Sequence, residues 1–233
     1  MIKMTIKLYD LCGGNEDHRF SPHCWKAKMA LAHKGLDFTT VATPFTAVAS
    51  VEGGDTRKVP VLVDGDAVIE ESFEIAKYLD RTYPDAPSLF NGSGSEELTK
   101  FVINWSNSQL HPAVAKLAVL DIYKALAPAD QAFFRQTREK LFGCTLEEFD
   151  AKFPKNGDTL KAALQPVEMT LRKQAFLGGD APIFADYVVF GALQWLRLTA
   201  SQDHLPKEGG VADWFGRLLD LYDGMGRNAR AAA

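Results

Sequence analysis

The first third of the chain alternates between extended and helical hydrophobic patterns. Alternating apolar residues in TIKLYDL predict a strand over Thr5–Tyr9. Ser21 and Pro22 then indicate a helix start, because serine is a common N-cap and proline suits the first helical position. We expect this helix to stop at Gly35, after which DFTTVAT, residues 37–43, predicts a second strand.

The segment VPVLVDGDAVIEES carries the clearest local signal in the chain. It predicts a strand over Val61–Val63, a turn at Asp64-Gly65 and a returning strand over Ala67–Ile69. Ser72 is then expected to cap a helix that ends before Pro84, because apolar residues recur there every three or four positions.

These elements predict two domains. Residues 44–58 have weak hydrophobic periodicity and indicate a loop with a short helix. The order of elements in the first domain is then β-α-β-α-β-β-α. This order implies a mixed four-stranded sheet with helices packed on it. The stretch YPDAPSLFNGSGSE is rich in Pro, Gly and Ser, as domain boundaries are. We therefore expect an α/β domain over residues 1–86, a linker over 87–95 and an all-helical domain over 96–233.

Apolar residues recur at helical spacing through the second half. Thr145 and Glu148 form a capping-box pattern at the start of one helix. Residues 186–200 are apolar nearly all round, which predicts a buried central helix. The full set of helices predicted in this half covers residues 96–110, 129–143, 145–149, 159–174, 186–200 and 211–224.

Composition excludes several function classes. The chain has 26 basic and 30 acidic residues, a net charge of −4, and neither domain has the basic excess of a phosphate-binding surface, so we expect no nucleic-acid partner. No run of about eighteen apolar residues occurs, and the first residues lack the pattern of a secretory signal. We therefore expect a cytoplasmic protein with no membrane span.

The cysteines argue against a disulfide scaffold or a metal site. Cys12, Cys24 and Cys144 are few and odd in number, and no C-x-x-C pair occurs. A structural zinc site usually draws on such pairs. We expect no bound metal, and no motif for a flavin or a nucleotide appears.

Ser21 is the first candidate for chemistry. At a helix N-terminus the free N–H groups and the helix dipole stabilise an anion, and a serine hydroxyl can donate a hydrogen bond to a thiolate. In Ser21-Pro22-His23-Cys24 a serine stands where a C-P-x-C dithiol motif has its nucleophile, so the thiol would have to arrive on a substrate or cofactor. A simple N-cap is the alternative interpretation.

Two further segments can bind a peptide-like ligand. A cis Val59-Pro60 bond would turn the Val59 N–H and C=O outward, whereas the usual X-Pro bond is trans. Glu70-Glu71-Ser72 places carboxylates at a helix N-terminus, where they and the N–H groups can hold an ammonium and a carboxylate together. A charged first turn with an ordinary cap is the alternative.

The order of these segments resembles the cytosolic glutathione transferases. The resemblance rests on KVPVL, the Glu-Ser pair, the Y-P-D-x-P linker and FLGGDAPIFADYVVFG, which is similar to the family's G-D-x-P-x-x-A-D element before the buried helix. It implies a thioredoxin-like N-terminal domain, glutathione as co-substrate and a homodimer. One position departs: Ile183 replaces the usual Ser or Thr three residues before Asp186, so that helix must rely on burial.

The resemblance also implies a role for each candidate residue. Ser21 corresponds to the thiol-activating hydroxyl of serine-type members, and Val59-Pro60 to the cis pair whose backbone holds the cysteinyl unit of glutathione. Glu71 and Ser72 correspond to the residues that bind the γ-glutamyl end. Lys58 precedes the Val-Pro pair and is assigned to the glycyl carboxylate.

A closer resemblance is to the bacterial β-etherases that cleave β-aryl ethers of lignin, and to related fungal transferases. It is carried end to end by SPHCWKAKMALAHKG, KVPVLVDG, YPDAPSLF and DWFGRLLDLYDGMGR. It implies that a glutathione thiolate attacks an electrophilic, aromatic acceptor and displaces a phenolate. Trp105, Asn107 and Leu110 are candidate walls of an acceptor site between the Ser21 loop and the first helix of the helical domain. Packing in the core or at an interface is the alternative interpretation of these residues.

Two other functions stay open at this point. Cys24 lies three residues after Ser21, hence on the same helical face, and an exposed Cys24 would support a glutathione-dependent thiol transferase. A buried Cys24 would be a small apolar core residue instead. A non-catalytic glutathione- or ligand-binding protein would use the same scaffold. His23 is expected to point away from the site.

Overall fold

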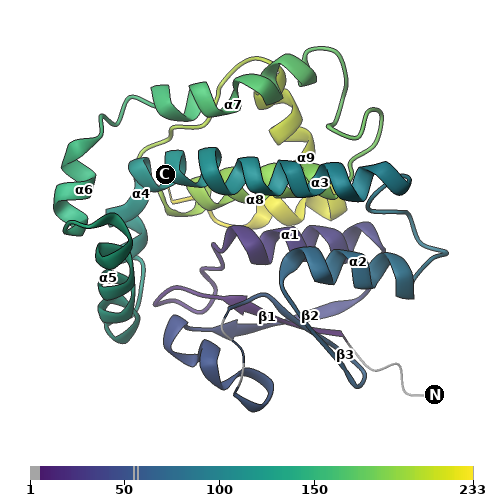
Figure 1. The fold of residues 1–233 in the computed structure, drawn as a ribbon, viewed down its shortest axis with the longest axis horizontal. Coiled ribbons are helices and arrows are strands. Elements are labelled where there is room, and N and C mark those ends of the chain that lie inside the picture. The colour runs from purple at the N-terminus through teal and green to yellow at the C-terminus, as the bar shows by residue number, and fades with distance from the viewer. Residues whose placement is uncertain (1–5, 55, 57, 233) are drawn as a thin grey trace.

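The structure of the protein, a computed structural model, describes residues 6–54, 56 and 58–232. Its N-terminal third is the expected thioredoxin-like domain, a four-stranded sheet with helices on both sides (Figure 1). The elements in chain order are β1 (Ile6–Leu11), α1 (Pro22–His33), β2 (Phe38–Thr43), η1 (Phe45–Gly53), β3 (Val61–Asp64), β4 (Ala67–Glu70) and α2 (Ser72–Thr82).

The sheet is mixed, with strand order β2-β1-β3-β4. Strand β1 runs parallel to β2 and antiparallel to β3, and β4 returns antiparallel beside β3. Helices α1 and α2 lie on one side of the sheet, facing the helical domain, whereas η1 lies on the other side (Figure 1). A parallel β1-β2 pair requires a crossover, and α1 supplies it.

Three local features differ from the sequence predictions. The short helix after β2 is a 3₁₀ helix, η1, and not an α-helix. Strand β3 continues through Asp64, so the hairpin turn is formed by Gly65 and Asp66. Ser72 is the first residue of α2 and Glu71 occupies the N-cap position, so Ser72 does not cap the helix. Thr5, predicted to begin the first strand, lies outside the described residues.

The C-terminal half is all helical, as expected. The loop after α2 spans residues 83–92, so the last residues of the expected linker already belong to α3. The helices are α3 (Ser93–Trp105), a π-helical turn η2 (Ser106–Leu110), α4 (His111–Lys124), α5 (Pro128–Phe142), α6 (Leu146–Lys152), α7 (Asp158–Leu171), α8 (Phe184–Thr199) and α9 (Gly210–Asn228). The predicted capping box forms at α6, where Thr145 and Glu148 bond to each other's backbone N–H.

Helix α4 was not predicted from the sequence. It follows α3 directly through η2, and its apolar residues Ala113, Leu117 and Ile122 are buried. A π turn holds one more residue than an α turn and so rotates the face that the following helix presents. The apolar stripe of α4 is therefore out of phase with that of α3, so the two helices do not form one continuous apolar stripe.

The buried helix α8 begins without a side-chain cap, as Ile183 requires. Asp186 compensates from inside the helix: its carboxylate accepts the backbone N–H of Ile183 at 3.0 Å and of Leu177 at 2.7 Å. It also accepts the N–H of Gly178 and the indole N–H of Trp214. These bonds satisfy a fully buried carboxylate, and they join α8 to α9 and to the preceding loop.

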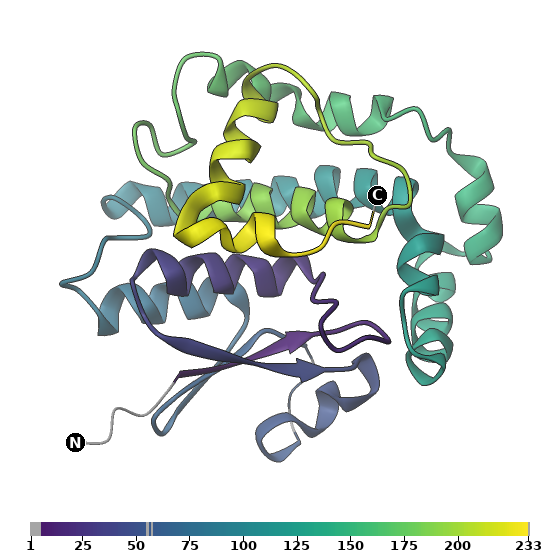
Figure 2. The ribbon, with the colours of Figure 1, turned by 180° about the vertical axis from the view of Figure 1, so that it is seen from behind.

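The two domains meet where α1 lies against α8, along the middle of the molecule (Figure 2). Gly191 in α8 permits the close approach, because a Cβ there would come within 2.4 Å of the Pro22 carbonyl oxygen. Beside it, the rings of Trp25 and Phe190 pack edge to face. The start of α1 is thus fixed by the helical domain.

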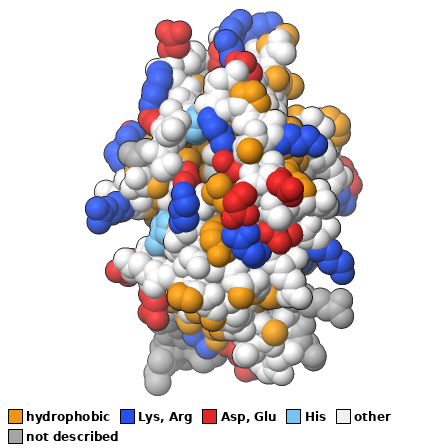
Figure 3. All heavy atoms as spheres, turned by 90° about the vertical axis from the view of Figure 1, so that its left-hand side faces the viewer, with side chains coloured by type: hydrophobic (Ala, Val, Ile, Leu, Met, Phe, Trp, Pro, Cys, Tyr) orange, Lys and Arg blue, Asp and Glu red, His pale blue; other side chains and the backbone are white. Residues whose placement is uncertain are grey.

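One side of the molecule brings α5, α6 and η1 together, at the left of Figure 1. Acidic and basic side chains are interspersed over this side (Figure 3). Among the described residues, no helix is both long enough and apolar enough to cross a membrane.

Candidate functional site

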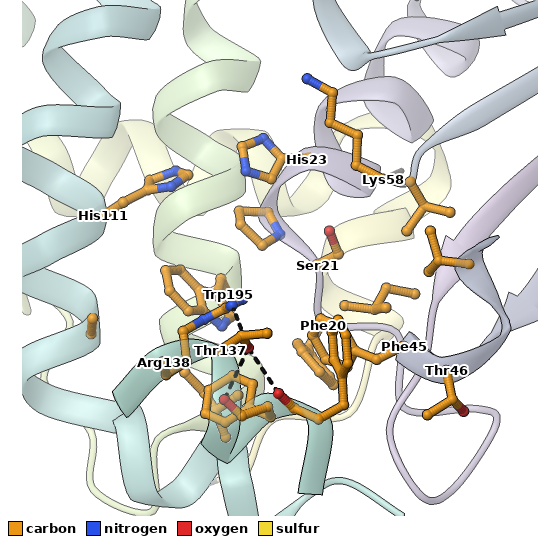
Figure 4. Close-up of a pocket in the computed structure, with 18 of the residues that line it drawn as sticks. Phe20, Ser21, His23, Phe45, Thr46, Lys58, His111, Thr137, Arg138 and Trp195 are labelled. Carbon is orange, nitrogen blue, oxygen red and sulfur yellow. Dashed lines mark hydrogen bonds between the residues drawn. The ribbon is translucent and has the colours of Figure 1, made fainter. Parts of the chain in front are cut away.

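A cavity of about 760 Å³ lies between the two domains (Figure 4). Most of its lining side chains are aromatic or aliphatic, as in most small-molecule sites. The N-terminal domain contributes Phe20, Ser21, His23, Phe45, Lys58 and Val59. The helical domain contributes, among others, His111, Val119, Phe134, Thr137, Arg138 and Trp195.

Ser21 is the N-cap of α1, as the alternative interpretation expected, and it lies in the wall of this cavity. Its Oγ accepts the backbone N–H of Cys24 at 3.3 Å, and its carbonyl accepts that of Trp25. The side chain is only 3% exposed. A thiolate brought to it would sit at the positive end of α1, beside a hydroxyl donor and away from bulk water.

The Val59-Pro60 bond is cis, as the resemblance implied. Lys58 and Val59 line the cavity together with Ser21. The Pro60 carbonyl accepts the N–H of Glu71, which ties the cis segment to the start of α2. Three of the predicted site segments are thereby brought together by the sheet, since β3 follows the cis bond and β4 leads into Glu71.

Glu71 and Ser72 lie at the N-terminus of α2, outside the cavity lining itself. Glu71 has φ of +75°, in the left-handed region that residues other than glycine rarely adopt. Such strain costs about 1–3 kcal/mol and concentrates at binding and catalytic sites. Ser72 is buried beside it.

Cys24 is fully buried and cannot meet a ligand in this cavity. Burial raises the pKa of its thiol far above the ordinary value, against the smaller opposing effect of the Ser21 hydroxyl. A neutral, enclosed thiol is a poor nucleophile. The structure therefore does not support a thiol transferase that uses Cys24.

The prediction that His23 points away from the site is wrong. His23 lines the cavity and packs edge to face on His111, with ring centroids 5.2 Å apart (Figure 4). Burial lowers the pKa of His23 well below its usual value and that of His111 to about 3, so both imidazoles are neutral at pH 7. Nδ1 of His23 lies 3.2 Å from Nζ of the buried Lys26.

None of the three candidate acceptor walls lines this cavity, and the alternative of core packing is confirmed for Leu110. Leu110 belongs to the hydrophobic core, Asn107 is exposed, and Trp105 lines a separate, smaller cavity beside Pro112. The rotation introduced by η2 turns α4 toward the cavity in place of α3, so that His111 and Val119 form this wall. An apolar repeat every three or four residues from 111 to 122 was the available signal.

The chemistry open to these residues is that of anion stabilisation and apolar binding. Among the described residues, no cluster of three or more His, Cys, Asp or Glu side chains is arranged to hold a metal ion. The cavity instead combines a hydroxyl at a helix N-terminus, the cis Val59-Pro60 segment that leads into β3, and an aromatic chamber. It suits a small peptide thiol next to an apolar second molecule.

Comparison with known families agrees with this arrangement. Residues 17–87 match the family described as "Glutathione S-transferase, N-terminal domain". Residues 98–219 match "Glutathione S-transferase, C-terminal domain". The two matches cover both halves of the structure in the order found here.

Individual relatives are distant in sequence but similar in fold. The glutathione S-transferase-like protein ustS of Aspergillus flavus is 25% identical over 76% of this chain and 74% of its own. The crystal structure of glutathione transferase GSTFuA3 from Phanerochaete chrysosporium is 27% identical with a TM-score of 0.74, over 94% of this chain and 92% of that one. The crystal structure of CsGST83044 from Ceriporiopsis subvermispora, in complex with glutathione, has a TM-score of 0.82. Its sequence is 23% identical, and the match covers 95% of this chain and 99% of that chain. Both domain matches together show that the chain belongs to the glutathione S-transferase family.

Proposed function

We propose that the protein is a serine-type glutathione transferase that adds the glutathione thiolate to an electrophilic aromatic acceptor. One observation carries the proposal: Ser21, at the N-terminus of α1, opens onto the same cavity as Lys58 and the cis Val59 backbone. A peptide laid along Val59 would place a cysteinyl sulfur near the Ser21 hydroxyl. The strained backbone of Glu71 next to this segment supports a binding role for the γ-glutamyl end.

Activation of the thiol would come from the helix end and the hydroxyl. A free thiol with a pKa near 8.5 is mostly protonated at neutral pH, and each unit by which the site lowers that pKa is worth about 1.4 kcal/mol. One hydrogen bond to a charged group contributes about 1.5–3 kcal/mol. Ser21 and the α1 dipole are therefore enough to make the bound thiol largely ionised at pH 7.

We further propose cleavage of a β-aryl ether next to a ketone as the reaction class. The thiolate sulfur attacks the β-carbon, a C–S bond forms, and the C–O bond breaks with its electron pair leaving on a phenolate. The phenolate then takes a proton from solvent. The aromatic walls, among them Phe45, Phe134 and Trp195, suit the two rings of such a substrate.

A titration with glutathione tests the proposal directly. We expect thiolate absorbance in the ultraviolet when glutathione binds at pH 7, and turnover of a model β-aryl ether ketone. Ser21→Ala should lose about 10²-fold or more in kcat with glutathione binding kept within a few-fold, whereas Ser21→Thr retains a capping hydroxyl and should keep part of the activity.

Two outcomes would contradict the proposal. Absence of glutathione binding would exclude every glutathione-dependent function for this chain. Binding without thiolate absorbance, and without turnover of aryl ethers or halogenated aromatics, would instead show the non-catalytic binding protein.

We also propose that two chains form a homodimer. Leu98 and Phe101 are large hydrophobic residues on α3, three positions apart, and they are 69% and 71% exposed. Val68 on the edge strand β4 is exposed as well. An apolar pair of this kind on a helix face indicates a protein interface, with α3 of one chain against the N-terminal domain of the other.

A further inference from the structure

The acceptor side of the cavity contains a cation with no carboxylate partner. Arg138, on α5, points into the cavity between Trp195 and Thr137 (Figure 4). Its Nη1 donates to the Thr137 hydroxyl at 3.1 Å, and its guanidinium carbon lies 4.9 Å from the centre of the Phe134 ring. Of the five N–H donors of an arginine, the described part of the chain thus occupies one.

The neighbouring arginine on α5 is paired, in contrast to Arg138. Arg135, one turn earlier on α5, forms ion pairs with Glu139 and Glu147. Arg138 has no ion pair among the described residues, and burial alone lowers the pKa of its guanidinium. It remains charged at pH 7, because an arginine does not lose its proton in proteins. An unpaired cation in a partly dry site raises the affinity for an anion.

The remaining charges of the cavity do not compensate Arg138. No Asp or Glu is found among the described residues that line it. His23 and His111 are neutral at pH 7, as their lowered pKa values require. Lys58 lines the other side, by the cis Val59-Pro60 bond, where the proposed function places the glycyl carboxylate of glutathione. Arg138 is therefore left for the second molecule.

We infer that the acceptor is an aromatic compound carrying a carboxylate group, and that Arg138 binds this carboxylate. The inference rests on the proposed function for the identity of the second molecule as an acceptor. The guanidinium offers parallel N–H donors that match a carboxylate in a bidentate pair. Phe134 and Trp195, which flank Arg138, supply surfaces for the ring that bears it. Arg138 is thus a specificity-determining residue: it selects acceptors by charge and fixes which end faces Ser21.

Equilibrium binding of 2-naphthoate and its neutral isostere 2-naphthamide tests this inference by calorimetry, without glutathione and without turnover. We expect wild-type protein to bind the carboxylate about 10- to 100-fold more tightly than the amide at pH 7. Arg138→Gln should abolish this preference, and Arg138→Lys should keep part of it. Lys140→Gln is the matched control, because it removes the same charge from the same helix at an exposed position outside the cavity.

Two results would overturn the inference. Equal affinity of the wild-type protein for the two ligands would show that the cavity does not select an anion. A preference that survives Arg138→Gln but is lost in Lys58→Gln would place the carboxylate in the glutathione half. Thermal unfolding of each variant shows whether that variant is folded. The comparison of the two ligands on the wild-type protein does not depend on any variant. Failure of the Ser21 experiments leaves this binding test intact, so the two proposals fail separately.

Discussion

The carboxylate of Asp130 accepts the backbone N–H of Thr46 at 2.8 Å, although the two residues are 84 positions apart. Its other oxygen accepts the N–H of Phe45 at 3.0 Å. Asp130 lies in the first turn of α5 and so holds η1, an element of the N-terminal domain, to the helical domain. The ring of Phe45 packs on Phe134 at the edge of the cavity, so the same contact closes one side of the site.

Removing the Asp130 carboxylate should weaken the contact between α5 and η1, which also borders the cavity. Asp130→Ala leaves two N–H groups without their acceptor, and we expect the free energy of unfolding to fall by about 1–3 kcal/mol. Asp130→Asn keeps one acceptor oxygen and should lose less. Urea denaturation measures both, with Asp180→Ala as an exposed control expected to change stability by less than about 0.5 kcal/mol. Equal stability of Asp130→Ala and wild type would show that the contact does not hold the domains together.

Because Lys26 is buried, we expect the free energy of unfolding to increase as the pH rises into the alkaline range. It is 2% exposed, and burial lowers its pKa to about 8, an effect only partly offset by Glu71. Between about pH 8 and pH 10.5 the folded state has lost this proton while the unfolded state still binds it, so the free energy of unfolding increases as pH rises. We expect a gain of about 2 kcal/mol from about pH 7.5 to about pH 10, relative to Lys26→Met.

The comparison with Lys26→Met isolates this group, because the other titrating residues are common to both proteins. His23 and His111, the nearest imidazoles, are neutral across the whole range. Urea midpoints measured in steps of pH provide the two curves. Parallel curves for the two proteins would mean that Lys26 keeps its proton throughout and that its pKa is not lowered.

Cys24 should be dispensable for chemistry. Because its thiol is buried and its pKa is raised by burial, we expect no mixed disulfide when the protein is incubated with oxidised glutathione. Cys24→Ala should keep kcat and KM for glutathione within a few-fold, with a loss of stability of about 1 kcal/mol from the small cavity. Intact-mass measurement checks the first expectation and steady-state kinetics the second. A glutathione adduct on Cys24 of the folded protein would restore the thiol-transferase interpretation.

The exposed pair on α3 predicts an effect on assembly. Leu98→Glu combined with Phe101→Glu places two like charges in the proposed interface, and we expect the double variant to be monomeric. Light scattering coupled to gel filtration gives the mass of each species. Leu141→Glu, at an equally exposed apolar position on α5, is the matched control and should leave the assembly unchanged. A wild-type protein that is monomeric at every concentration would exclude the homodimer.

Local patterns were sufficient for most elements of the N-terminal domain and for two helix caps. Ser21 caps α1, the hairpin follows the Val-Pro pair, and Thr145 forms its capping box, because each of these depends on residues within a few positions of one another. The cis state of Val59-Pro60 came from the resemblance and not from the residues, since most X-Pro bonds are trans.

The acceptor cavity depends on contacts that no local pattern contains. The candidate walls Trp105, Asn107 and Leu110 do not line the cavity, because the π turn η2 rotates α4 relative to α3 and α4 forms this wall instead. That turn has no clear signature in the sequence. His23 reaches the cavity because the Gly191 contact sets the position of α1 against α8. Arg138 is an ordinary helical arginine in sequence, whereas Arg135 three residues earlier is paired with two glutamates.

The chain pattern alone thus determines an α/β segment followed by a helical one, most of their elements except α4, and a serine at a helix N-terminus. Those features follow from hydrophobic period and capping, which act over one or two turns. The tertiary structure decides which side chains share the cavity, which thiol is buried and which cation lacks a partner. These properties arise from the packing of segments far apart in sequence, and burial and charge pairing are defined only once that packing exists.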